Sequence, residues 1–343
     1  MANAVIGSDI SSQLRKLRQE YPHIYSCIDL NRVADFGPEW SAPGRDTPRD
    51  DFGAEEAGGR GSSYITAQQS ALTRERGIRT LVDLVQRKRT ASSDIIVDLL
   101  GGDGLVQRVV SEGDPRPPVI VTCDASPFMV EAAWERGIPA LLHRAEHCLF
   151  RTGAVGGVLL AYGSHHIAPA QRATVAAEAF RILQPGGIFV LHDFAVGTPV
   201  DTWFSKVVDV YSATGHDYVH FEPQEVDSLL ASAGFADVEV GRMDDSFVVS
   251  AATAEEAELE LGRYLVNMYG LVRLVDELGT PAAYRRAFEL ASGIFVYEDG
   301  QGELCSVRTD RAPGRPLWST TMPRAALVGF GRKPAERNRP TAM

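Results

Sequence analysis

Short apolar runs alternate with helical patterns through the middle of the chain. Five such runs are rich in Val, Ile and Leu, and they lie at 95–100, 119–124, 139–143, 156–162 and 187–194. Buried parallel strands have continuous apolar runs, and crossover helices between them produce this alternation. The pattern predicts a doubly wound α/β core that begins at about residue 92.

Further elements are predicted on both sides of these five runs. Helical patterns lie at 10–21, 66–87, 199–213, 223–233 and 254–278, and apolar strand patterns lie at 236–243 and 324–333. We therefore predict a seven-stranded, mostly parallel sheet with six parallel strands. The predicted parts are an N-terminal helical lid region (1–91), the core (92–253), a helical insertion (254–320), and a closing strand with a tail (321–343).

The segment from Phe36 to Ser63 differs in composition from the rest of the chain. It is rich in Gly, Pro, Asp, Glu and Arg and contains almost no aliphatic residue. Such a composition favours a long loop, which can serve either as a lid over a site or as a solvated linker.

Composition excludes several classes of function. The net charge of −11 provides no basic footprint for nucleic acid. Four scattered cysteines without CxxC spacing favour a reducing cytoplasm, and the sequence shows neither a secretory signal nor an apolar run long enough for a membrane span. We expect a cytoplasmic protein with a small-molecule partner. An apolar stripe from Leu261 to Leu274 is either core or the contact of a homodimer.

The sharpest local signal is IIVDLLGGDG, from Ile95 to Gly104. It is a strand that ends in Asp98 and enters a glycine-rich turn, where a ligand can approach the backbone closely. A dinucleotide site is disfavoured because Gln107 stands at the third glycine position of GxGxxG. Asp98 and Asp103 instead suit a cationic ligand.

This run resembles the first motif of class I S-adenosylmethionine-dependent methyltransferases, D-x-G-x-G-x-G, with Leu100 in place of its first glycine. CDASPFM, with Asp124, is similar to the family's D-x-S-x-x-M pattern, and RAEHCLF is similar to its DAExLPF segment. LLAYGSHHI and FRILQPGGIFVLHDF follow in the family's order. The resemblance implies a Rossmann-like fold and S-adenosylmethionine as the cofactor. The residues expected to bind it are Asp98, Gly101, Gly102, Asp103, Gly104, Asp124, Ala125, Ser126, Met129, Ala145, Glu146, His147 and Tyr162.

Five of the eight histidines fall at or after strand ends that border the expected pocket. Histidine is the usual general base near neutral pH, and methylation of a hydroxyl or carbon acid requires loss of a proton. We predict His165 as this base, and Asp193 can orient a histidine or bind the substrate. The candidate catalytic residues are His165, His166, His192, Asp193, Tyr211 and His216.

A metal site is a second reading of the same residues. His216 and His220, with His192 and Asp193, offer imidazole and carboxylate ligands, but no known motif matches, and we predict no resident metal.

The acceptor is the least specified part of the prediction. We expect C- or O-methylation of a small molecule in bacterial specialised metabolism. The alternatives are a 2-oxo acid carbon, a prenyl diphosphate, and a cofactor-binding relative that transfers no methyl group. A diphosphate would need an arginine cluster, which the N-terminal segment can supply only if it folds over the pocket with Arg15, Lys16, Arg18 and Arg32.

Overall fold

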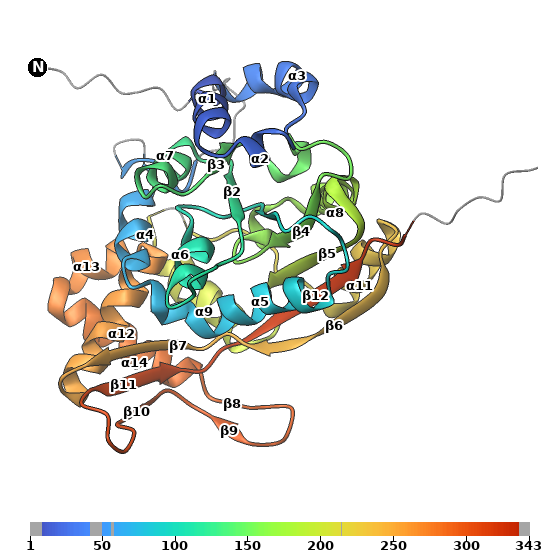
Figure 1. Ribbon diagram of the computed structural model, residues 1–343. Coiled ribbons are helices and arrows are strands. Elements are labelled where there is room, and N and C mark those ends of the chain that lie inside the picture. Colours follow the sequence, from blue (N-terminus) through green and yellow to red (C-terminus); the bar gives the residue numbers. More distant parts are fainter. Residues whose placement is uncertain (1–8, 42–49, 56–57, 214, 336–343) are drawn as a thin grey trace, which may run out of the picture.

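A computed structural model describes residues 9–41, 50–55, 58–213 and 215–335. Its central feature in these ranges is a seven-stranded sheet in the order β3-β2-β1-β4-β5-β12-β6 (Figure 1). β12 pairs antiparallel with both neighbours, and the other pairs are parallel. The predicted fold with six parallel strands is confirmed. The bounds are β1 (Ile96–Asp98), β2 (Ile120–Asp124), β3 (Ala140–Leu142), β4 (Val155–Leu160), β5 (Leu183–Asp193), β6 (Ala236–Asp244) and β12 (Ala325–Arg332).

Helices cover both faces of this sheet because successive side chains of each strand point to opposite faces. Ile96 belongs to a core cluster shared with α5 (Glu75–Lys88) and α6 (Leu105–Ser111). The next residue, Val97, packs in a second cluster with α8 (Pro169–Ile182) and α11 (Pro223–Ser232). Because β1, β2, β4 and β5 are parallel, their carboxyl ends meet at one edge of the sheet. An open α/β sheet binds its ligand at this edge.

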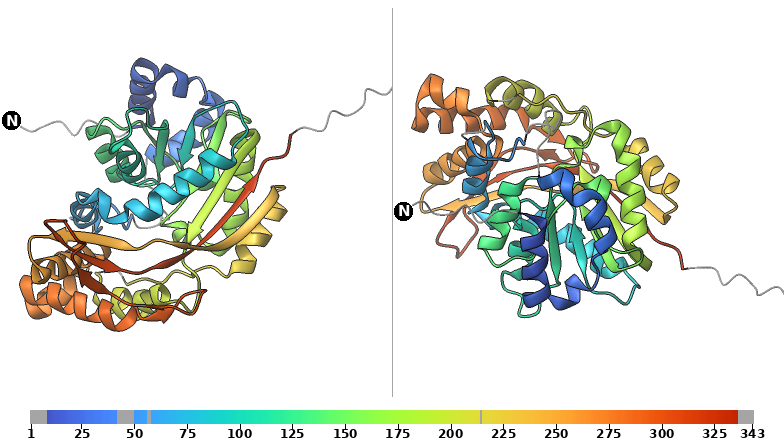
Figure 2. Two further views of the ribbon diagram at one scale, coloured as in Figure 1. Left: turned by 60° about the horizontal axis from the view of Figure 1, so that its bottom comes forward. Right: turned by 90° about the horizontal axis from the view of Figure 1, so that it is seen from above.

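Beyond the core, a second layer consists of helices and a smaller sheet (Figures 1 and 2). Its members are α12 (Ala254–Tyr269), α13 (Val272–Leu278), α14 (Thr280–Ile294), a sheet of β7 (Phe247–Ala251), β11 (Trp318–Met322) and β10 (Arg308–Asp310), and a hairpin of β8 (Tyr297–Glu298) and β9 (Leu304–Cys305). The prediction of a helical insertion over 254–320 is wrong beyond Ile294, because β11 pairs with the extension β7 of the core.

The apolar stripe of this layer is core rather than a dimer contact. Leu261, Leu265 and Leu271 are fully buried within the single chain, and Met268 and Leu274 are nearly so. The stripe therefore leaves no surface for a second copy.

The N-terminal region is more helical than its composition predicted. It contains α1 (Ile10–Glu20), α2 (Pro22–Tyr25), α3 (Leu30–Ser41), α4 (Gly61–Gln68) and a 3-10 turn, η2 (Ala71–Arg74). The predicted loop over 36–63 is thus helical at both ends, and its residues 42–49 and 56–57 lie outside the described ranges. The single helix predicted over 66–87 is interrupted at η2. None of the helices described is long and apolar enough to cross a membrane.

α1 lies against the edge strand β3, where the Leu142 N–H donates to the Gln13 side chain at 2.8 Å. Its Lys16 lies over the Trp134 ring, and Arg32 of α3 forms an ion pair with Glu178 at 2.6 Å. These cations therefore do not form the phosphate-binding cluster that a diphosphate acceptor would need.

Candidate active site

The turn after β1 has the geometry of a close-approach loop. Gly102 and Gly104 have φ of 55° and 82°, in the left-handed region that favours glycine. A Cβ at Gly101 would lie 2.8 Å from Thr122 Cγ2 and 2.9 Å from Asp98 Oδ2. This contact explains the glycine at 101, although Leu100 occupies the position of the family motif's first glycine.

Asp124 at the end of β2 is connected directly to this turn. Its Oδ2 accepts a hydrogen bond from the Gly102 N–H at 3.0 Å, and its Oδ1 accepts one from the Ser126 N–H at 2.9 Å. Burial raises the pKa of Asp124 to about 6, although these backbone hydrogen bonds oppose the shift. Each carboxylate oxygen keeps a second lone pair with which it can accept a hydrogen bond from a ribose hydroxyl.

Asp98 is a buried carboxyl group that forms no ion pair among the described residues, although the Arg74 guanidinium is close enough to favour its ionised form and so lower its pKa. Its Oδ2 has no hydrogen-bond partner among the described residues. Burial, and then repulsion by Asp124, raise its pKa to about 8. A ligand that carries a positive charge would reverse this shift by stabilising the ionised carboxylate.

A stability measurement can test the state of Asp98. Its pKa is about 8 in the folded chain and about 4 when unfolded, so the folded state binds the extra proton between these values and stability falls as pH rises through this window. Asp98→Asn replaces the titrating carboxyl group with a neutral amide and therefore removes that loss of stability. We expect the ligand-free variant to melt at least about 3 °C above the wild type at pH 8 and to match it near pH 4. A variant no more stable than the wild type at pH 8 would contradict this assignment.

Asp103 departs from its expected role. Its buried carboxylate forms ion pairs with Arg108 at 2.9 Å and with Arg136 at 3.4 Å. These guanidinium groups neutralise the negative charge of Asp103, which the sequence analysis expected to attract a cationic ligand. Asp103 therefore ties α6 and α7 together instead of providing free negative charge.

The remaining cofactor candidates follow β2 and β3. Ser126 caps α7 (Pro127–Glu135) by accepting from the Met129 N–H, so Ala125 to Met129 form the turn beyond Asp124. Ala145, Glu146 and His147 form the 3-10 turn η3 after β3, and Ala145 and Glu146 are buried. The His147 ring is stacked on Phe36, with centroids 4.4 Å apart.

These residues fit S-adenosylmethionine. Asp124 would hold the ribose, the turn at Gly101 to Gly104 would border the methionine end, and Asp98 would favour the positive charge. η3 would border the adenine. An unpaired buried carboxylate and a glycine turn without Cβ atoms are the two observations that carry this fit.

A cavity that opens to solvent lies beyond this turn, and the empty space in it and at its mouth is about 420 Å³. Besides Tyr162 and two histidines, it is lined by three arginines that sequence reasoning missed, Arg60, Arg74 and Arg324. They come from the N-cap of α4, from η2 and from the turn between β11 and β12, and no common motif links them. The lining residues are Phe52, Arg60, Tyr64, Arg74, Tyr162, His165, His166, Phe194, Phe204, Phe247, Met268, Tyr269 and Arg324.

His165 and Asp193 form a buried pair at this cavity. Nδ1 of His165 lies 2.8 Å and 3.0 Å from the two Asp193 oxygens, and the His165 backbone N–H also donates to Asp193 at 2.8 Å. Burial alone would raise the pKa of Asp193, but His165 and the Phe194 N–H lower it to about 2. An ionised Asp193 fixes the proton on Nδ1 and leaves Nε2 of His165 as the basic nitrogen.

His216 joins this pair, whereas His192 lies apart from it. The His216 ring is 5.0 Å from the His165 ring and 4.1 Å from Phe204. Burial, followed by the neighbouring His165 and His220, lowers the pKa of His216 to about 2. The fully buried His192 instead packs on Tyr162, with centroids 4.3 Å apart, and burial lowers its pKa to about 4.

Tyr162 lines the cavity and has a strained backbone, whereas Tyr211 does not line the cavity. Tyr162 has φ of 63°, unusual for a residue with a side chain, and its hydroxyl donates to Asp245 at 2.9 Å. Arg74 lies over its ring at 3.8 Å. Tyr211 packs against the hydrophobic core from α10 (Asp209–Tyr211) and does not line the cavity, so the structure does not support it as a catalytic residue.

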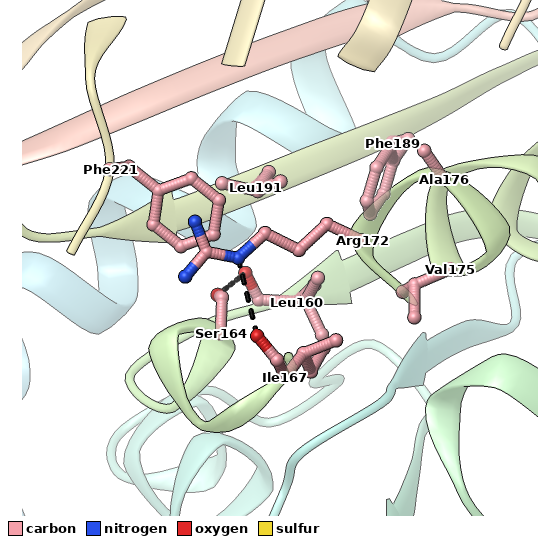
Figure 3. A pocket seen from close by; sticks show the side chains of 9 residues that line it. All are labelled: Leu160, Ser164, Ile167, Arg172, Val175, Ala176, Phe189, Leu191 and Phe221. Atoms are coloured by element: carbon pink, nitrogen blue, oxygen red, sulfur yellow. Dashed lines mark hydrogen bonds between the residues drawn. The ribbon is translucent and has the colours of Figure 1, made fainter. Parts of the chain in front are cut away.

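Arg172 of α8 positions both histidine-bearing loops from a second cavity on the other side of β4 and β5 (Figure 3). Its Nε donates to the Ile167 carbonyl at the end of η4 (Ser164–His166), the 3-10 turn that carries His165. Another nitrogen donates to the Val219 carbonyl, between His216 and His220. This guanidinium therefore sets the relative position of the two loops.

The segment after the undescribed residues 42–49 covers the site. The Ser126 hydroxyl donates to Asp50 at 2.8 Å, and the Phe52 ring contacts Tyr64 and His166 edge-on. The Tyr218 hydroxyl donates to Asp51 at 2.5 Å. These contacts link the cofactor turn to the histidine loops, as expected of a lid.

The chain is similar to one known domain family and to several solved structures. The profile of a methyltransferase domain family matches residues 97–191. No curated protein matches the chain. Among solved structures, Haemonchus contortus phosphoethanolamine N-methyltransferase 2 is 13% identical, with a TM-score of 0.46 over 76% of this chain and 53% of its own. The YcgJ protein of Bacillus subtilis is 15% identical, with a TM-score of 0.43 over 75% of this chain and 99% of its own. The chain thus spans about half the length of the first of these two proteins. The domain match over residues 97–191, the sheet order and the geometry of the cofactor turn agree with the resemblance to class I S-adenosylmethionine-dependent methyltransferases.

Proposed function

We propose that this enzyme methylates a small, negatively charged acceptor at an oxygen or carbon atom that loses a proton. The His165–Asp193 pair at the wall of the cavity is the observation that carries this proposal. The bound cofactor supplies the methyl group, and when its S–CH3 bond breaks the electron pair remains on sulfur. Nε2 of His165 takes the proton from the acceptor O–H or C–H, and the electrons of that bond form the new bond to carbon.

The charges in the cavity favour a monoanionic acceptor. Arg324 is ion-paired with Asp245 at 2.7 Å, whereas Arg74 lies over the Tyr162 ring and its Nε has no hydrogen-bond partner within the described part of the chain. Arg60 donates to the Met268 carbonyl. Few cationic donors therefore remain for a ligand. A carboxylate, as in a 2-oxo acid or an enol or phenol acid, fits this arrangement better than a diphosphate does.

The lid and the aromatic lining support reaction in a water-poor site. Phe52, Tyr64 and Phe204 line the cavity together with His165. Exclusion of water strengthens the His165–Asp193 interaction and holds the acceptor in line with the methyl group. We place the reaction in bacterial specialised metabolism, because the layers added around the core resemble those of tailoring enzymes.

The proposal is tested by measuring S-adenosylhomocysteine formation with paired acceptors, each an acid and its methyl ester. We expect turnover of the acids, and a Michaelis constant at least about tenfold higher for the esters, because a charge-assisted hydrogen bond to Arg74 is lost. Arg74→Met should raise the Michaelis constant for the acid alone. The matched control, Arg87→Met on the exposed face of α5, should change neither value. Equal use of acid and ester by the wild type would contradict an anionic acceptor.

A further inference from the structure

Three imidazoles from two separate loops converge beside the cavity. His165 and His166 come from η4, and His216 comes from the loop that follows α10. One ring nitrogen from each of the three lies within 4.8 Å of the others. A general base needs only one histidine, so the proposed proton transfer gives no role to the other two.

The nitrogens are arranged as ligands rather than as satisfied hydrogen-bonding groups. Nε2 of His216 is buried and has no hydrogen-bond partner among the residues described. Nδ1 of His165 is bound by Asp193, which leaves Nε2 available. In metal sites the second ring nitrogen of a histidine ligand usually donates to a carboxylate, a backbone carbonyl or water, which fixes the tautomer and orients the ring.

We infer that His165, His166 and His216 bind a divalent transition metal ion at the edge of the acceptor cavity. This inference rests on the proposed function for the reaction that the ion serves, and it replaces the proposed role of His165 as proton acceptor with a role as metal ligand. The sequence analysis predicted no resident metal, and the inference changes that expectation. The alternative ligand set named there was His192, Asp193, His216 and His220. His192 instead packs on Tyr162, and its Nε2 lies 3.9 Å from Asp245.

The ligand set narrows the class of metal. Three imidazoles suit Zn²⁺, Fe²⁺, Co²⁺ or Ni²⁺ rather than Mg²⁺ or Ca²⁺, which prefer oxygen. Bonds of about 2.1 Å place the nitrogens of a tetrahedral site about 3.4 Å apart, so the three side chains need to move closer by roughly 1 Å. Three protein ligands leave open positions, as in catalytic metal sites.

The open positions give the site a chemical role. His165 and His166 line the cavity, so an acceptor oxygen there can become a further ligand. Coordination makes an attached O–H, or a C–H next to a coordinated carbonyl, more acidic, as it does for zinc-bound water. Once Nε2 of His165 is a ligand it no longer takes the proton, which then passes to solvent. The electron pair left on the acceptor forms the new bond to the methyl carbon, as before.

Metal binding is measured on the full chain after removal of metal with EDTA. Co²⁺ is titrated and followed by its visible absorption, and Zn²⁺ is titrated by calorimetry. We expect one ion per chain with micromolar or tighter affinity. His216→Ala and His166→Ala should each weaken binding at least tenfold, and Asp193→Asn should weaken it about 10–100-fold. The matched control is His23→Ala on the exposed side of α2.

Binding of S-adenosylhomocysteine shows whether each variant is folded, and His216→Gln provides a second, larger replacement. Absence of Co²⁺ binding by the wild type overturns the inference, and so does equal binding by the His23 and His216 variants. Full methyl transfer by the metal-depleted wild type overturns the ion's part in the reaction and leaves the proposed function standing. Co²⁺ bound by the triad without methylation of any acidic acceptor supports the site and overturns the proposed function.

Discussion

Replacing His165 with alanine is expected to lower turnover about 100-fold or more while leaving the affinity for S-adenosylhomocysteine within about twofold of the wild type. His165 forms its pair with Asp193 at the end of β5, whereas Asp124 and the glycine turn lie at the ends of β2 and β1. Its loss therefore removes proton transfer, or a metal ligand, without disturbing the cofactor site. Single-turnover methyl transfer and calorimetry measure the two properties separately.

Asp193→Asn tests the same pair from the other side. An asparagine amide donates to Nδ1 and so places the proton on Nε2, which turns the basic nitrogen of His165 into a donor. We expect a loss of turnover comparable with that of His165→Ala. If His165→Ala reacts normally and His216→Ala is inactive, the base is His216. If both react normally, the acceptor loses no proton to a histidine, and an alkene or a neutral amine becomes the better acceptor.

The sheet and the cofactor turn could be predicted because their signals are local. Each parallel strand lies in a continuous apolar run, and Asp98 and Asp124 are the last residues of two of these strands. The link between His165 and Asp193 was predictable in outline, since β4 and β5 are neighbours and their ends meet at one edge of the sheet. Cofactor chemistry therefore followed from residues close together in the sequence.

The acceptor cavity could not be predicted in the same way because its walls come from distant segments. Arg60, Arg74 and Arg324 are brought together only when η2 and the added sheet pack on the core. The structure does not support Tyr211 as a catalytic residue, and the reason is local. The turn from Phe204 to Val208 is π-helical, and its extra residue changes which face of the helix the following side chains occupy. A regular helical pattern over 199–213 cannot show such a shift.

Asp124 connects the sequence motif most directly to a measurable property. Asp124→Ala is expected to weaken S-adenosylhomocysteine binding by more than tenfold, because hydrogen bonds to a charged group contribute roughly 1.5–3 kcal/mol. Asp124→Asn keeps one oxygen acceptor and should lose less. Asp227→Ala on the exposed side of α11 is the matched control and should bind normally. NADH should show no saturable binding to any of these chains.

The pH dependence distinguishes a ribose contact from a general distortion of the turn. The ionised form of Asp124 is the better acceptor, and its pKa of about 6 in the ligand-free chain means that protonation competes with the ligand below that value. Affinity of the wild type for S-adenosylhomocysteine should therefore fall as pH decreases from 7 to 5. The Asp124→Ala chain should show a smaller decrease, since it has no carboxylate to protonate at this position. A variant that is weakened tenfold yet keeps the wild-type pH profile would show that Asp124 acts by holding Gly102 and Ser126 in place, and that another group binds the ribose.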